Sequence, residues 1–142
     1  MITLSTETRF FLELTKTQSV LSRRLDARLG GISLNWFIIM FHLSQAPDEQ
    51  MRRIDLADKV GLTASGITRL LGPMEKIGLV KSKASEHDGR VSHISLASGG
   101  KTKLIEAVED LELFAEEVIP EGQRKTLANT NTFLAEIAVK VK

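Results

Sequence analysis

The run from Leu62 to Leu71 constrains the fold more than any other part of the chain, because its polar and apolar residues separate at helical spacing. Thr63 opens the run, and a threonine hydroxyl at that position can cap a helix. Three apolar residues recur at spacings of three and four and share one helix face: Ile67, Leu70 and Leu71. Three polar residues fall on another face: Ser65, Thr68 and Arg69. The run therefore predicts a helix with a buried back and a small, hydrogen-bonding front.

A second short helix is predicted just before this run, from Arg53 to Val60. Gly61 follows it, where the chain must turn sharply before the next helix begins. Two helices joined by a tight turn with glycine are typical of a helix-turn-helix. Pro73 lies inside the second helix, which we expect to continue beyond it in bent form to Ile77.

Two short strands are predicted next, over residues 79–82 and 91–96, with Gly89 in the turn between them. Asp88 and Arg90 flank that glycine. A helix-turn-helix followed by such a hairpin is a winged helix, and it predicts binding to duplex DNA. The major groove admits a helix with small polar side chains, and an arginine at a hairpin tip can enter an adjacent minor groove.

The charge distribution supports this prediction. Residues 52–103 hold ten Lys or Arg against five Asp or Glu, a net charge of +5. Residues 104–142 hold four Lys or Arg against eight Asp or Glu, a net charge of −4, and residues 1–51 have a net charge of zero. This net positive charge lies over the predicted winged helix, which we call the reader, and is the pattern expected of a segment that contacts DNA phosphates. A chance cluster of basic residues on a solvated face would look the same.

Longer apolar helices are predicted on both sides of the winged helix, over residues 6–29, 33–45, 98–118 and 122–140. In the second of these, four residues are predicted to form the core stripe: Leu34, Phe37, Ile38 and Phe41. We expect a mainly α protein with a small β-hairpin wing. Its winged helix-turn-helix core would occupy residues 51–103, and residues 1–50 and 104–142 would supply helices that dimerise.

Several classes of protein are excluded or disfavoured. The chain has no cysteine, so it has no disulfide, thiolate zinc site or cysteine redox sensor. His42, His87 and His93 lack the spacing of metal ligands, and no nucleophile elbow, phosphate loop or paired catalytic carboxylates occur. No apolar run is long enough to span a membrane, and the N-terminus lacks the pattern of a secretion signal. We therefore expect a cytoplasmic protein that is not an enzyme and needs no metal or cofactor.

In the order and spacing of its motifs the chain resembles the MarR family of dimeric winged-helix transcriptional regulators. The resemblance lies in Ile54-Asp55-Leu56-Ala57, in the run from Gly61 to Leu70, in Met74-Glu75-Lys76-Ile77-Gly78-Leu79-Val80, and in Asp88-Gly89-Arg90 before Ser95-Leu96. The resemblance implies a homodimer. We predict a sequence-specific DNA-binding transcriptional regulator, in particular a ligand-responsive repressor, that acts on a near-palindromic DNA site. The chain departs from the family at Gly72-Pro73, where helix-favouring residues are common, and at Ala97 after Leu96.

The predicted DNA-binding residues are Thr63, Ser65, Thr68, Arg69, Lys81, Lys83, Asp88 and Arg90. Serine and threonine hydroxyls can donate or accept hydrogen bonds, and an arginine can pair with guanine or bind a phosphate. Thr63 is better explained as a helix cap, and Asp88 as the partner that orients Arg90. Lys81 and Lys83, like Arg52 and Arg53, are either phosphate contacts or a solvated face.

The family resemblance also implies a small-molecule effector, which four residues could hold: Trp36, Phe37, Met40 and Phe41. An ordinary core explains these residues better than a ligand pocket does, and nothing in the sequence names a ligand. Two other functions stay open at this stage. One is a protein-interaction module whose winged helix does not bind DNA, and the other is a small-molecule enzyme or carrier built on the apolar helices.

Overall fold

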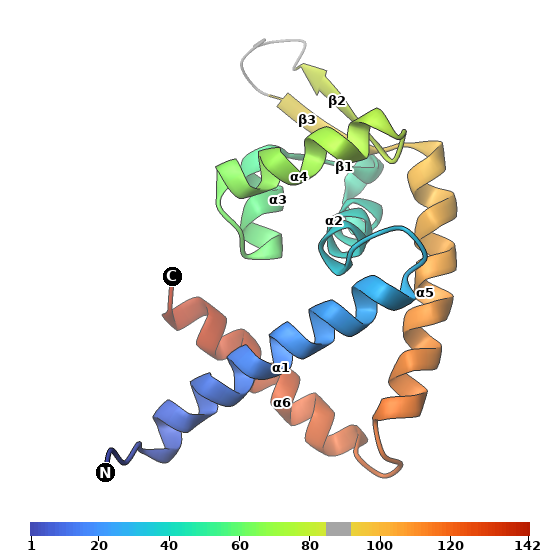
Figure 1. Cartoon of the computed structure of the whole chain (residues 1–142). Coiled ribbons are helices and arrows are strands. Elements are labelled where there is room, and N and C mark those ends of the chain that lie inside the picture. Colours follow the sequence, from blue (N-terminus) through green and yellow to red (C-terminus); the bar gives the residue numbers. More distant parts are fainter. Residues whose placement is uncertain (85–91) are drawn as a thin grey trace. The chain divides into compact units, whose positions relative to one another are not determined.

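The computed structural model describes residues 1–84 and 92–142, and the chain divides into two compact units, Met1–Asp110 and Leu111–Lys142. Figure 1 shows the helices and strands in chain order: α1 (Thr6–Arg28), α2 (Leu34–Gln45), the short 3-10 turn η1 (Pro47–Glu49), β1 (Gln50–Arg52), α3 (Arg53–Val60), α4 (Ala64–Lys76), β2 (Val80–Ala84), β3 (Ser92–Leu96), α5 (Ser98–Val118) and α6 (Arg124–Lys140). This is the mainly α fold with a small β wing that the sequence predicts.

The helix-turn-helix forms where the sequence places it. Gly61 ends α3 in the left-handed conformation (φ 79°), which glycine adopts without a steric penalty. Thr63 then caps α4, because its hydroxyl accepts a hydrogen bond from the Gly66 amide at 3.1 Å. α4 runs through Pro73 and ends at Lys76. These local signals set the residue at which α4 begins.

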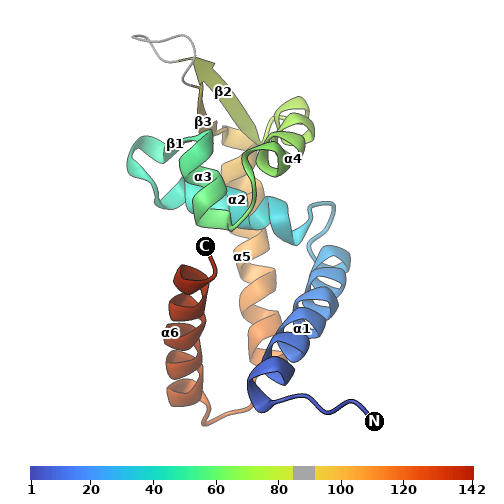
Figure 2. The same cartoon turned by 90° about the vertical axis from the view of Figure 1, so that its left-hand side faces the viewer.

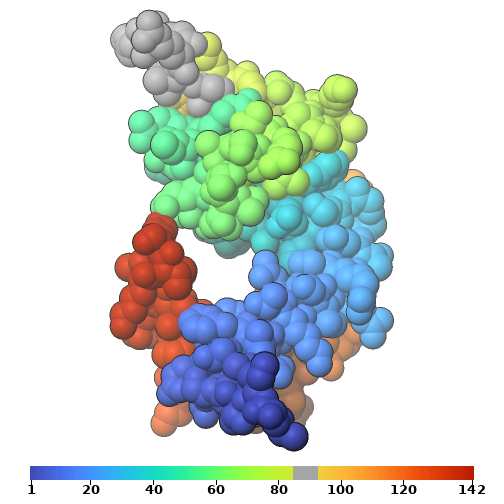
Figure 3. All heavy atoms as spheres, turned by 60° about the vertical axis from the view of Figure 1, so that its left-hand side comes forward, coloured from blue at the N-terminus to red at the C-terminus, as the bar shows by residue number. Residues whose placement is uncertain are grey.

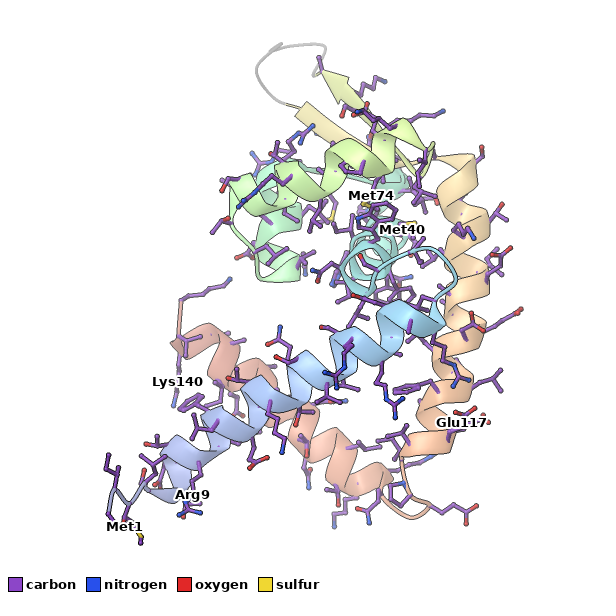
Figure 4. The ribbon with its side chains drawn as sticks, viewed as in Figure 1. Met1, Arg9, Met40, Met74, Glu117 and Lys140 are labelled. Atoms are coloured by element: carbon purple, nitrogen blue, oxygen red, sulfur yellow. The ribbon has the colours of Figure 1, made fainter. Side chains whose placement is uncertain are left out.

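The core of the first unit centres on α2, which contacts α1, α3, α4 and the sheet. Its fully buried residues are Ile39, Met40 and Leu43. Figure 4 labels Met40 on α2 and Met74 on α4, and both side chains are completely buried. The predicted core stripe of α2 was therefore wrong about which face of the helix is buried, since Phe41 of that stripe is 40% exposed. α2 is apolar nearly all round, so its periodicity could not select the buried face.

A short strand that the sequence analysis did not predict, β1, completes an antiparallel sheet in the order β1-β3-β2 among the described residues. Met51 of β1 and Ser82 of β2 both pair with Ile94 of β3. Directly paired residues share a sheet face, and Ile94 is fully buried. Met51, Ser82 and Ile94 therefore lie on the face that packs on the helices, while the alternate residues lie on the opposite face.

The first turn of α5 packs tightly against the base of the wing. A Cβ built on Gly100 would lie 2.1 Å from the carbonyl oxygen of Leu79 and 2.7 Å from Cδ1 of Leu96. Only glycine permits this approach. The Lys101 ammonium also forms an ion pair of 2.8 Å with Glu49. The start of α5 is thereby attached to the winged helix within the first unit.

Much of the apolar surface of the terminal helices stays exposed in the single chain. On α1, Phe11 is 46% and Leu12 56% exposed, and only Leu25 is buried. In the second unit, α6 buries no residue, and its Phe133 is 47% exposed. Within the ranges 1–84 and 92–142, no helix has both the length and the apolar character needed to cross a membrane.

Candidate nucleic-acid interface

The two faces of α4 differ as the sequence predicts. Ile67, Leu71 and Met74 are at most 1% exposed and attach the helix to the core. Burying side chains of this size contributes about 1.5–3 kcal/mol each. The polar residues on the other face are exposed: Ser65, Thr68 and Arg69. In the space-filling view, α3 and α4 (green) form an open surface of the molecule (Figure 3). The front of α4 is thus free to enter a groove.

Thr63 has a structural role in the chain. Its hydroxyl is engaged by the Gly66 amide and also lies 3.2 Å from the Ser65 hydroxyl. A Cβ on Gly66 would lie only 3.2 Å from the Thr63 hydroxyl oxygen, so a side chain at this position would crowd the capping hydroxyl. The structure therefore brings Thr63 together with Ser65 at the start of α4, where backbone amides also favour an anion.

The strand β2 stands beside α4 in Figure 2. Hydrogen bonds between polar groups join the two elements. The carboxylate of Glu75 accepts hydrogen bonds from the Ser82 amide at 3.1 Å and from the Ser82 hydroxyl at 3.0 Å. The guanidinium of Arg53, at the start of α3, donates to the Ser82 hydroxyl at 3.2 Å and to the Thr68 hydroxyl at 3.4 Å. These four residues link α3, α4 and β2. Sequence reasoning treated Arg53 only as a possible phosphate contact, because nothing local predicts a bridge across 15 and 29 residues.

Lys81 and Lys83 lie on the other face of the sheet. Lys81 pairs with Ser95, and Lys83 pairs with His93, which in turn pairs with Arg52 of β1. Both lysines are exposed. The register therefore groups them with Arg52 and His93, and it does not bring them to the sheet face that Ser82 shares with the helices. As a group they make the outer face of the sheet basic.

Asp55 partly neutralises that outer face. Its carboxylate accepts two hydrogen bonds from the Arg52 guanidinium, at 2.8 Å and 3.1 Å. The bond from Arg52 lowers the pKa of Asp55, and the charge of His93 lowers it further. Both members of the pair are exposed, so it contributes little to stability. A shallow hollow of about 420 Å³ lies beside the pair, lined by Ala46, Pro47, Asp48, Gln50, Met51, Arg52, Asp55 and His93.

Two of the predicted DNA-binding residues, Asp88 and Arg90, lie outside the described residues. So does His87. Among the residues that the structure describes, no group of three His, Asp or Glu side chains could hold a metal ion.

The predicted effector residues spread around α2. Met40 is completely buried, whereas Trp36 and Phe37 are half-buried. The rings of Phe37 and Phe41 stack at 6.2 Å, and the edge of His42 meets Phe41 at 5.6 Å. Burial lowers the pKa of His42, and the charge of Lys59 lowers it further. The structure brings Phe37 and Phe41 together on one side of α2 and places Met40 in the core.

Comparison with known proteins finds one matching family model and several similar solved structures. The model of the MarR family matches residues 30–91. This segment of the chain is therefore similar to the MarR family. No curated protein matches the chain.

Solved structures of transcriptional regulators share the fold over nearly the full length. The transcriptional regulator BldR from Sulfolobus solfataricus is 24% identical, with 96% of this chain and 99% of that chain covered and a TM-score of 0.80. A MarR family transcriptional regulator from Streptomyces coelicolor, solved in complex with DNA, is 20% identical, with 96% and 90% covered and a TM-score of 0.77. The PcaV regulator of the same organism, solved with its natural ligand, is 15% identical, with 100% of each chain covered and a TM-score of 0.80.

These comparisons confirm the predicted resemblance to the MarR family over residues 30–91 and the predicted fold class.

Proposed function

We propose that the chain is a sequence-specific DNA-binding regulator that reads duplex DNA with the exposed face of α4. The observation that carries this proposal is the division of α4 into a buried apolar back and an exposed front of Ser65, Thr68 and Arg69. Such a front can donate and accept hydrogen bonds at base edges, and Arg69 can pair bidentately with guanine. Lys81 and Lys83 are proposed to attract backbone phosphates. Arg90 is proposed as a further DNA contact, with Asp88 as the partner that orients it.

We propose further that the chain acts as a homodimer, with residues 1–50 and 104–142 as the dimerisation region and 51–103 as the reader. The exposed apolar side chains of α1 and α6 support this, because a chain that stays alone rarely leaves such helices uncovered. A dimer would present two readers about one helical turn apart, roughly 34–36 Å, on a near-palindromic site.

A ligand-responsive repressor is the form of regulation we propose. An effector near Trp36, Phe37, Met40 and Phe41 would lie on α2, which contacts both α1 and the helices of the reader. A ligand there could bias the position of α4 relative to the dimerisation helices. PcaV, of the same fold, was solved with a natural ligand, which supports the idea of an effector. Trp36 is the single tryptophan of the chain, so quenching of its fluorescence reports binding directly.

Selection of bound duplexes from a random pool tests the function. We expect recovery of a palindromic consensus, and sedimentation of the complex at two chains per duplex. Recovery of unrelated sequences from a low-salt selection would refute sequence-specific reading. A consensus without symmetry, bound by one chain, would refute only the dimer.

A further inference from the structure

The polar chain from Glu75 through Ser82 and Arg53 to Thr68 connects the wing to the front of α4. Ser82 is its central member, because its hydroxyl donates to Glu75 at 3.0 Å and accepts from Arg53 at 3.2 Å. The amide of Ser82 also donates to Glu75, at 3.1 Å, from the outer edge of β2. Glu75 therefore covers part of a sheet edge and holds β2 against α4.

Arg53 can connect the wing strand to α4 because its guanidinium group is planar and carries two terminal nitrogens that donate to different acceptors. One of its terminal nitrogens reaches Ser82 on the wing and the other reaches Thr68 on α4. A lysine carries the same charge but has one compact donor group on a flexible stem, so it cannot hold two hydroxyls at fixed geometry. The bridge thus depends on the shape of the arginine as well as on its charge.

We propose that Arg53, Ser82 and Glu75 are positioning residues that orient the Thr68 hydroxyl, so that base discrimination by α4 depends on the wing strand β2. This inference rests on the proposed function, in which Thr68 meets a base edge. Thr68 and Ser82 are exposed, so water competes with their hydrogen bonds in the free chain. A duplex that covers α4 would exclude that water and strengthen the whole chain of bonds. The effect should therefore be larger in DNA discrimination than in stability.

The test compares wild type with Arg53→Lys, Ser82→Ala, Thr68→Val and the double variant Ser82→Ala/Thr68→Val. The probes are the duplex that wild type selects from a random pool, its single-base-pair variants and a scrambled duplex of equal length. Thr68→Val identifies the base pair that Thr68 reads, because valine keeps the shape and removes the hydroxyl.

At that base pair we expect Arg53→Lys and Ser82→Ala to lose about threefold to tenfold of discrimination, the range of one net hydrogen bond. Affinity of Arg53→Lys for the scrambled duplex should not change, since the charge is kept. The double variant should discriminate no worse than Thr68→Val alone. Urea denaturation of each variant excludes loss of folding as the cause.

The possible failures are distinguishable. If Arg53→Lys and Ser82→Ala discriminate as well as wild type, the positioning role is wrong and the proposed function stands. If the loss of Ser82→Ala adds to that of Thr68→Val in the double variant, Ser82 acts on DNA independently of Thr68, which also overturns the inference. If wild type selects no duplex, the proposed function fails and the inference fails with it.

Discussion

Gly100 offers the most quantitative test of the packing between α5 and the wing. An added Cβ would stand 2.1 Å from the Leu79 carbonyl oxygen, against an ordinary contact distance of about 3.5 Å. That oxygen cannot move easily, because it accepts the Ala97 amide bond at 3.0 Å, and the Leu79 amide is bonded to Met74 at 3.0 Å. Gly100→Ala must therefore shift the backbone by roughly 1 Å or more and strain that bond.

The expected loss follows from three contributions. Overpacking costs about 1–3 kcal/mol, and weakening the Ala97–Leu79 bond costs up to about 1 kcal/mol. The higher helix propensity of alanine returns about 1 kcal/mol. We therefore expect Gly100→Ala to lower the free energy of unfolding by about 2 kcal/mol, which corresponds to a melting temperature lower by about 4–8 °C for a chain of this size.

Urea denaturation followed by far-UV circular dichroism, at one fixed protein concentration, measures this loss. Gly72→Ala is the matched control, because Gly72 is also helical but its added Cβ would meet nothing within 4 Å. Its gain in helix propensity is opposed by the restriction that Pro73 places on the preceding residue, so we expect a change within about 1 kcal/mol. A Gly100→Ala chain as stable as wild type, or a Gly72→Ala chain equally destabilised, would refute the packing argument.

Three further predictions concern single residues. Thr63→Ala should lower the free energy of unfolding by about 1 kcal/mol because the cap on the Gly66 amide is lost, whereas Thr63→Ser should keep it; urea denaturation separates the two. Burial lowers the pKa of His42 in the folded chain, so the unfolded chain binds more protons. Stability should therefore be complete above the ordinary pKa of about 6.5 and fall as the pH decreases below it, and His42→Gln should reduce that slope. Arg69→Ala should lose about 1–3 kcal/mol of discrimination at one base pair in a binding assay, and equal loss on every sequence would assign Arg69 to phosphate instead.

The elements that the sequence predicts well depend on local signals. α3 coincides with its predicted range because Gly61 stops it, and α4 begins where the Thr63 hydroxyl caps it. The boundary glycines and caps act within three or four residues, so they can be recognised without knowledge of the fold.

The features that the sequence does not predict depend on distant partners. β1 is only Gln50–Arg52, and it exists because Ile94, more than forty positions away, pairs with Met51. The face of α2 that is buried depends on the helices and the sheet that pack around it. In the folded chain Ile39 and Leu43 lie in the core, whereas Phe41 is exposed. The sheet register, likewise non-local, groups Lys83 with His93 and Arg52 on one face of the sheet.

The central claim is that the front of α4 reads bases. The most direct test is one titration that compares wild type with the triple variant Ser65→Ala/Thr68→Ala/Arg69→Ala on the selected duplex and on a scrambled duplex of equal length. We expect the triple variant to bind both duplexes with the same weak affinity, while wild type prefers the selected one. A triple variant that still prefers the selected duplex as strongly as wild type would contradict the account.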